Sequence, residues 1–172
     1  MVPAFNQLYF SIHKTLETRF VGNLLALDPG ETMGWSLFRC ETGGIELVDC
    51  GQLLCTPLAP VGIERTRALI TKCNPQHIAY EDYRVYNWKA NQHSWSELHT
   101  PKLIGCIVTI AHLRDIPTSC ELAQQPKNFV TDEKLEIWKM YQKGQRHARD
   151  SIRHGLFWLL FRDKGPKPTP VN

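Results

Sequence analysis

Three acidic residues stand where apolar segments of this sequence begin or end. Leu24-Leu25-Ala26-Leu27 is typical of a buried strand and runs directly into Asp28, after which Pro29-Gly30 turns the chain. A second short strand pattern ends in Glu81, and Asp150 lies near the start of an apolar helical pattern. A buried carboxylate is costly unless a cation neutralises it. Clustered carboxylates suit Mg²⁺, or Mn²⁺ as a substitute, so these residues indicate metal-dependent chemistry on phosphate groups.

The acids are stronger evidence for a metal site if the fold brings them together. A right-handed crossover would place the strand ending at Glu81 beside the strand ending at Asp28. His147, Asp150 and His154 are spaced i, i+3 and i+7, so they share one face of the predicted helix. If that helix packs on the sheet, Asp28, Glu81, Asp150 and His147 converge, and two metal ions ~4 Å apart could activate water against a phosphodiester.

Each acid also has a purely structural explanation. Asp28 could cap the turn that follows it, and Glu81 could be a surface acid at a strand end. Asp150 could pair with a basic neighbour, for which the candidates are Lys143, Arg146 and Arg153.

The elements that must position these residues form an α/β pattern. The expected elements are strands 23–28, 34–40, 45–54, 77–81 and 116–122, and helices 61–73, 101–114, 131–142 and 146–161. This order predicts a mixed five-stranded sheet, its first three strands antiparallel, with helices on both faces. Residues 1–22 form a predicted amphipathic arm, 23–161 the main domain and 162–172 a flexible tail.

Composition narrows the classes of protein further. The 172 residues predict one domain with a real core, and the net charge of +3 is mild. The last third is basic, which fits either a polyanion lying across it or a solvated helix surface. Six cysteines without C-x-x-C spacing argue against zinc and for reduced thiols. With no secretory signal and no apolar run of membrane-spanning length, we expect a cytoplasmic protein, in a host cell if it is viral.

The acidic motifs, taken in order, resemble a known family. Asp28-Pro29-Gly30 with Gly34-Trp35 after it, the strand end Ile78-Ala79-Tyr80-Glu81-Asp82, and His147-x-x-Asp150 opening an apolar helix resemble RuvC-type Holliday-junction resolvases. These belong to the RNase H-like superfamily. The likeness is greatest to short, phage-like members, which Cys50-Gly51-Gln52-Leu53 also fits. It covers about residues 23–161, and it implies an RNase H-like fold.

The resemblance also implies roles for the acids. Asp28 matches the acid that bridges two metal ions, and Glu81 matches the acid on the leaving-group side. Asp150 matches the acid that helps hold the ion activating water. His147 lies where relatives have Asp or His, so it counts among the catalytic candidates. Neutral imidazole binds Mg²⁺ poorly, so His147 is not counted among the metal ligands.

Aromatic and basic residues supply candidates for contacts with nucleic acid. Tyr83, Arg84 and Tyr86 alternate in a predicted loop, where aromatic rings can stack on splayed bases or, equally, pack on the core or a second subunit. In the family, lysines before the last helix approach the scissile phosphate, and Lys127 and Lys134 are the candidates here. Further basic candidates for DNA contact are Arg146 and Arg149.

By this resemblance we expect a homodimer in which the helix opening at Pro101 contributes to the interface. Its two active sites would resolve four-way DNA junctions by paired symmetric nicks that leave 5′-phosphate and 3′-hydroxyl ends. One alternative keeps the fold but acts on structured RNA or other branched DNA. Another is an actin-like nucleotide-binding protein, although 172 residues are too few for two such domains. A third is a junction-binding protein without catalysis.

Overall fold

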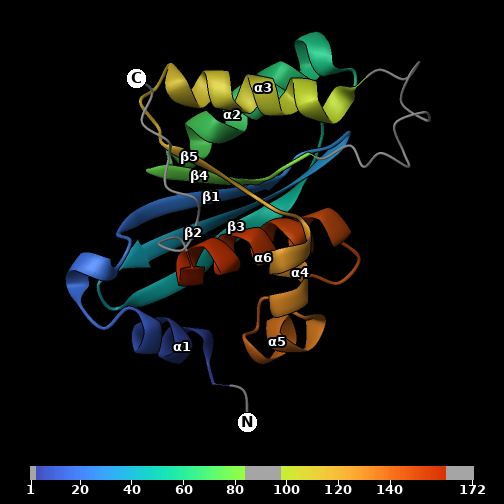
Figure 1. Cartoon of the computed structure of the whole chain (residues 1–172). Coiled ribbons are helices and arrows are strands. Elements are labelled where there is room, and N and C mark those ends of the chain that lie inside the picture. The colour runs from blue at the N-terminus through green and yellow to red at the C-terminus, as the bar shows by residue number, and fades with distance from the viewer. Residues whose placement is uncertain (1–2, 84–97, 162–172) are drawn as a thin grey trace.

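A computed structural model describes residues 3–83 and 98–161 of the chain (Figure 1). The strands are β1 (Gly22–Asp28), β2 (Thr32–Glu41), β3 (Gly44–Leu54), β4 (His77–Glu81) and β5 (Thr118–Glu121). The helices are α1 (Phe5–Ile12), α2 (Ile63–Cys73), α3 (His99–His112), α4 (Gln124–Phe129), α5 (Asp132–Ile137) and α6 (Arg146–Phe161), and short helical turns cover Leu16–Thr18 and Leu58–Gly62.

The five strands form one mixed sheet in the order β3-β2-β1-β4-β5. β1 pairs antiparallel with β2, and β2 with β3, while β4 runs parallel to β1 and β5 parallel to β4. The predicted sheet is therefore confirmed. Because β1, β4 and β5 are parallel neighbours, their carboxyl ends meet at one edge of the sheet. Asp28, Glu81 and Glu121 are the last residues of these three strands.

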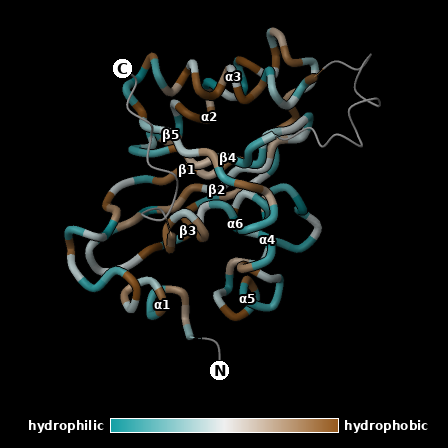
Figure 2. The backbone as a smooth tube through the Cα atoms, in the orientation of Figure 1, coloured by the Kyte–Doolittle hydropathy of each residue, from teal (hydrophilic) through white to brown (hydrophobic). Residues whose placement is uncertain are grey.

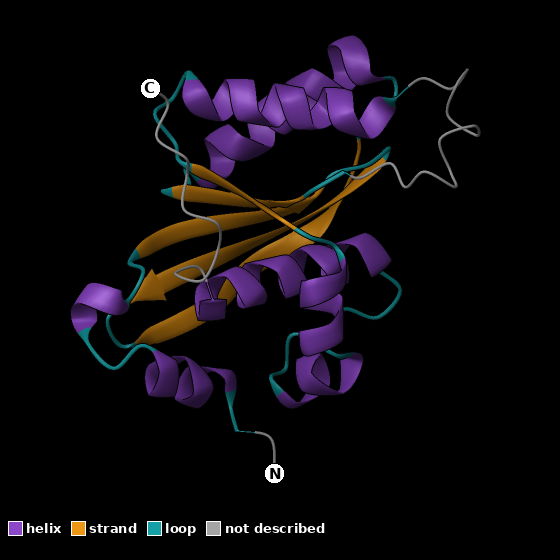
Figure 3. Cartoon of the chain, in the orientation of Figure 1, coloured by secondary structure: helices purple, strands orange, loops and turns teal. Residues whose placement is uncertain are grey.

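Helices cover both faces of the sheet, as the α/β pattern predicted. α2 and α3 lie over one face, and α6 lies over the other with α1, α4 and α5 beyond it (Figures 1 and 3). Alternate residues of β1 serve the two cores: Leu25 and Leu27 pack with α2 and α3, whereas Leu24 and Ala26 pack with α6. Figure 2 shows hydrophobic and hydrophilic stretches alternating along α3, as expected of a helix with one buried face. In the described part of the chain, no helix has the length and apolar character to cross a membrane.

The first turn of α6 is held against the sheet by two close contacts. A Cβ built on Gly34 of β2 would lie 1.8 Å from the carbonyl oxygen of His147, so only glycine permits this approach. From β3, the side-chain Oε1 of Gln52 accepts a hydrogen bond of 3.1 Å from the backbone N–H of His147. This N–H is one of the donors that a helix start leaves without an intrahelical partner. The two antiparallel strands thus fix where α6 begins.

The amino-terminal segment packs under α6, on the side away from the sheet. Phe5 and Trp138 rings meet edge-to-face at 5.2 Å between centroids, and the Trp138 indole N–H donates to the Pro3 carbonyl at 3.0 Å. The buried His13 ring lies 2.9 Å from the carbonyl oxygen of Leu159 in α6. These contacts give α1 the covering role expected of it. The division into arm, domain and tail stays a prediction, and residues 162–172 lie outside the described residues.

One predicted helix and the loop before it are wrong. In place of a helix over 131–142, the chain forms α4 from a segment expected to be loop, and then the separate helix α5. Thr131 starts α5 because its side chain accepts from the backbone N–H of Lys134. Lys139 has a φ of 60°, a left-handed conformation that ends helical structure soon after Ile137. Smaller differences are confined to strand and helix ends.

Replacement of Gly34 tests the close approach of β2 and α6. In Gly34→Ala the methyl group meets His147 backbone, which cannot swing aside as a side chain would. We expect a loss of unfolding free energy of at least about 1–3 kcal/mol, the usual cost of overpacking, measured by denaturant titration. Gly43→Ala is the control, since a Cβ there meets nothing within 4 Å. Equal stability of the two variants would contradict the contact.

Candidate active site

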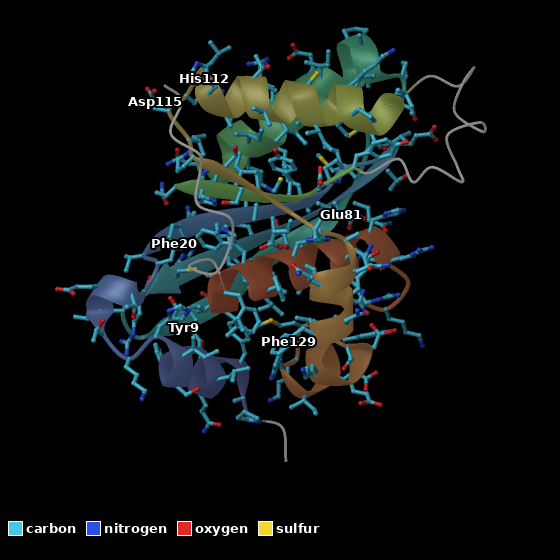
Figure 4. All side chains as sticks on the ribbon, viewed as in Figure 1. Tyr9, Phe20, Glu81, His112, Asp115 and Phe129 are labelled. Carbon is cyan, nitrogen blue, oxygen red and sulfur yellow. The ribbon has the colours of Figure 1, made fainter. Side chains whose placement is uncertain are left out.

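The three acids singled out by the sequence gather at the carboxyl edge of the sheet, where α6 crosses it. Figure 4 shows Glu81 at the end of β4, beside the ribbons of α4 and α6. The Lys127 ammonium lies 3.1 Å from Glu81 Oε2 and 3.6 Å from Asp150 Oδ2, so it links β4 to α6. Asp28 is close enough for both carboxylates to act on its charge.

Asp28 is buried and paired with His147. The Nδ1 atom of His147 lies 2.8 Å from Asp28 Oδ2. Burial and the negative charges of Glu81 and Asp150 raise the pKa of Asp28 from 3.8 to about 6, against the opposing effects of His147 and Lys127. Asp28 is therefore the carboxylate whose charge the present surroundings stabilise least.

Glu81 has the opposite character. Burial by itself would raise its pKa, but His154 and Lys127 outweigh burial and hold the pKa of Glu81 at about 2. The fully buried His154 ring places Nε2 2.7 Å from Glu81 Oε2 and Nδ1 3.3 Å from Glu121 Oε2. Burial lowers the pKa of His154, and the two carboxylates overcome this and raise it. For Glu121, burial dominates and raises the pKa.

Asp150 is tied to an arginine one helical turn away. Arg153 Nη1 donates to Asp150 Oδ1 at 2.5 Å. The same guanidinium bonds Asp132 at the start of α5 and donates through Nε to the Val130 carbonyl at 3.0 Å. Pairing with a local base, which the sequence offered as the structural explanation of Asp150, is thus real. It coexists with convergence, because Asp150 Oδ2 faces Lys127.

Proteins similar to this chain are found by comparing structures and not by comparing sequences. No protein-family model matches the chain, and a search of curated proteins finds no match. Thermus thermophilus RuvC, solved in complex with a Holliday junction substrate, superposes with a TM-score of 0.64 at 16% identity, covering 83% of this chain and 96% of that one. The fowlpox virus Holliday junction resolvase gives 0.55 at 14%, covering 83% and 99%. The yeast mitochondrial resolvase Ydc2 gives 0.55 at 12%, covering 91% and 85%.

The chain has a RuvC-like fold. Identities of this size establish the fold and not the activity, so roles for individual residues depend on the geometry of this chain. The expectation of an RNase H-like α/β sheet of the RuvC type is confirmed.

Among the other sequence candidates on this RuvC-like fold, the two lysines separate clearly. Lys127 lies among the acids, and although burial lowers its pKa, Glu81 and Asp150 raise it overall. Lys134 points elsewhere: its ammonium donates to the Phe129 carbonyl at 2.6 Å and lies 3.9 Å from the centroid of the Phe129 ring. Of the two, Lys127 is the one that lies among the acids.

The arginine and tyrosine candidates differ in placement. The Arg146 side chain is 81% exposed beside the acids, with Nε 4.0 Å from Asp150 Oδ2. Arg149 is engaged within the protein, because it donates to the Gln142 carbonyl at 2.7 Å and stacks over Tyr141. Tyr83 directly follows the Glu81 end of β4 and is half-buried. Arg84 and Tyr86 lie outside the described residues.

Three further residues belong to this site and are not among the catalytic residues predicted from the sequence: His154 and Arg153, which contact Glu81 and Asp150, and Glu121, which contacts His154. His154 carried a signal, because its i+7 spacing from His147 put it on the face of Asp150. Glu121 carried a weaker one, as an acid at the end of a strand. Arg153 was foreseen only as a partner that would make Asp150 structural.

The side chains of the site are of a chemical type that binds divalent cations, but their present arrangement is less suited to doing so. Asp28, Glu81 and Asp150 offer carboxylate oxygens, which hard cations such as Mg²⁺ prefer. Yet no group of three or more His, Cys, Asp or Glu side chains among the described residues is arranged to hold a metal ion. Lys127 supplies positive charge between Glu81 and Asp150 instead. The site therefore meets the electrostatic requirement for a cation, and metal binding requires Lys127 and the carboxylates to adjust.

The pKa of Asp28 tests whether the acids share one site. In Glu81→Gln a negative charge disappears, so the pKa of Asp28 should fall from about 6 towards 3.8, though not reach it because burial remains. Carboxyl ¹³C NMR titration measures this pKa. Glu46→Gln is the control, because Glu46 is an exposed acid near the start of β3, at the end of the sheet opposite the site, where it pairs with Arg39. An unchanged Asp28 titration in Glu81→Gln would show that the two carboxylates do not interact.

Proposed function

We propose that this chain is a divalent-metal-dependent endonuclease that resolves four-way DNA junctions. The observation that carries the proposal is the meeting of Asp28, Glu81 and Asp150 around Lys127 at one edge of a RuvC-like sheet. The negative charge at this edge would attract a metal ion, and the metal ion would in turn bind the phosphate. Two of the similar structures, those of Thermus thermophilus RuvC and of a fowlpox virus resolvase, are complexes with Holliday junction DNA, which supports this substrate class.

Asp28, Glu81 and Asp150 would hold Mg²⁺, or Mn²⁺ in its place, as two ions in each active site. When bound, such ions supply an activated water and stabilise the leaving oxygen of the phosphodiester. Asp28 must be ionised to take part, so its raised pKa links metal affinity to pH. Glu81, with its pKa near 2, is ionised at any ordinary pH.

The chain's own side chains perform the remaining tasks. His147 holds the orientation of Asp28 through the bond at Nδ1, and its second ring nitrogen, Nε2, can take a proton from water near the site. Lys127 can turn its ammonium from the acids to the phosphate, where it would stabilise the charge that develops during attack. The exposed Arg146 would contact the DNA backbone, as would Arg84, with Tyr83 and Tyr86 stacking on bases. Arg149 would do so only by leaving its contacts with Gln142 and Tyr141.

Symmetric nicks in two strands need two active sites related by a two-fold axis, so the enzyme would act as a homodimer. α3 would contribute to the interface. Its outer face supports this, because α2 and α3 border a mainly apolar groove lined by Ile63, Lys102, Gly105, Cys106, Thr109 and Ile110.

The deciding experiment is incubation of the protein with an end-labelled immobile four-way junction, with and without Mg²⁺. We expect paired nicks at symmetric positions, with 5′-phosphate and 3′-hydroxyl ends that a ligase reseals. Asp28→Asn, Glu81→Gln and Asp150→Asn should each lower cleavage by at least about 100-fold, because each removes charge that holds the metal. Junction binding, followed by gel shift in Ca²⁺, should survive in all three.

Parallel reactions on flaps, linear duplex and structured RNA decide between substrates. Preferential cleavage of structured RNA or of flaps would replace the junction by that substrate. Full cleavage by Glu81→Gln, or the same cleavage without any divalent cation, would refute the metal-dependent assignment.

The two lysine candidates make a matched pair. Lys127→Met should lower the cleavage rate by roughly 10²–10³-fold, as for loss of one group that stabilises developing charge, while Lys134→Met loses far less. The reason is position, since only Lys127 lies among the acids. Single-turnover cleavage with the junction bound in advance measures the difference. Equal losses in the two variants would remove Lys127 from its role.

A further inference from the structure

Two glutamates end neighbouring strands, and an imidazole contacts both of their carboxylates. Glu81 and Glu121 are register partners in the parallel pair β4 and β5. Both side chains are largely buried, at 18% and 11% exposure, so water screens their mutual repulsion poorly. Like charges in adjacent strand positions destabilise a sheet unless a third group separates them. At this edge that group comes from α6.

The His154 ring joins the two carboxylates. Each of its nitrogens faces one of them, Nε2 towards Glu81 and Nδ1 towards Glu121. The ring is completely buried, and so it touches neither solvent nor a substrate. An imidazole held at both nitrogens cannot rotate, and it therefore fixes the direction from which Glu81 accepts.

We propose that His154 is a positioning residue that holds Glu81 in its working orientation, with Glu121 anchoring the far side of the ring. The inference rests on the proposed function only in taking Glu81 as a metal ligand. His154 and Lys127 both bind Oε2 of Glu81. In the described part of the chain, the other oxygen, Oε1, accepts no hydrogen bond, so the bridge leaves one oxygen of Glu81 available to an incoming cation.

A second buried histidine shows what a purely structural role looks like. His13 is also almost fully buried, and its ring meets a backbone carbonyl, that of Leu159, rather than an acid of the site. His13 contacts α6, the same helix that carries His154. Replacing either with glutamine should reduce stability, but only His154 should affect Glu81. His13→Gln is therefore the matched control.

The test measures Mn²⁺ binding to the protein without DNA, by calorimetry or electron paramagnetic resonance, beside thermal stability and single-turnover cleavage. For His154→Gln we expect metal affinity and cleavage rate each to fall roughly 10- to 100-fold, the usual effect of removing a partner that orients a ligand. Junction affinity in Ca²⁺ should not change. His13→Gln should melt earlier yet bind Mn²⁺ as the wild type does.

The double variant His154→Gln/Glu121→Gln supplies the rescue. The amide introduced at position 121 can donate to the side-chain carbonyl oxygen introduced at position 154. The amide at position 154 then donates to Glu81, so an uncharged chain replaces the bridge. Recovery of metal affinity relative to His154→Gln alone is expected, and Glu121→Gln alone tests the anchor should His154→Gln fail to fold.

The outcomes separate the two proposals. Wild-type Mn²⁺ affinity in folded His154→Gln, or an equal loss in His13→Gln, would overturn the positioning role. If the wild type cleaves no junction but loses Mn²⁺ affinity on His154→Gln, the positioning role stands and the proposed substrate falls. A wild type that binds no Mn²⁺ overturns both.

Discussion

Repulsion among buried carboxylates is the constraint on which this structure depends. Four acids, Asp28, Glu81, Glu121 and Asp150, come from three strand ends and one helix to a single edge of the sheet. Each is paired with a cationic or hydrogen-bonding group, because unpaired buried charge costs several kcal/mol or more. The partners are His147, His154 and Arg153 of α6 and Lys127 of α4.

The strands and the helices contribute different members of this group of acids and their partners. The parallel strands β1, β4 and β5 deliver acids because parallel neighbours end together. α6 contributes the acid Asp150 and two of the bases, because its helical period places His147, Asp150 and His154 on one face while its apolar side covers the sheet. Gly34 and Gln52 set the start of α6, and so they fix the register between bases and acids. Antiparallel β2 and β3 thus serve the site without contributing an acid to it.

This division explains what the sequence could predict. Asp28, Glu81 and Asp150 were accessible because each sits at a boundary between an apolar segment and a turn, a pattern that depends only on local residues. The sheet followed from strand order and crossover handedness. The partners were harder to predict, because the Glu81–His154 contact joins residues 73 positions apart. The spacing of His154 from His147 places it on the face of Asp150, but nothing local shows which residues its ring meets. α4 was missed because it forms in a segment expected to be a loop, and α5 is shorter than the predicted helix because left-handed Lys139 ends it early.

Glu81 and Asp28 have opposite pKa shifts, and so they affect the stability of the fold in opposite ways. The pKa of Glu81 falls from 4.5 to about 2, so this group stabilises the fold above pH 4.5 and loses that contribution as the pH falls towards 2. The pKa of Asp28 rises from 3.8 to about 6, so its ionisation destabilises the fold as the pH rises through that range. The two shifts therefore act on the stability of the fold in opposite directions. The cost concentrated on Asp28 is the part that a bound cation would relieve, and relief of that cost favours metal binding at this edge of the sheet.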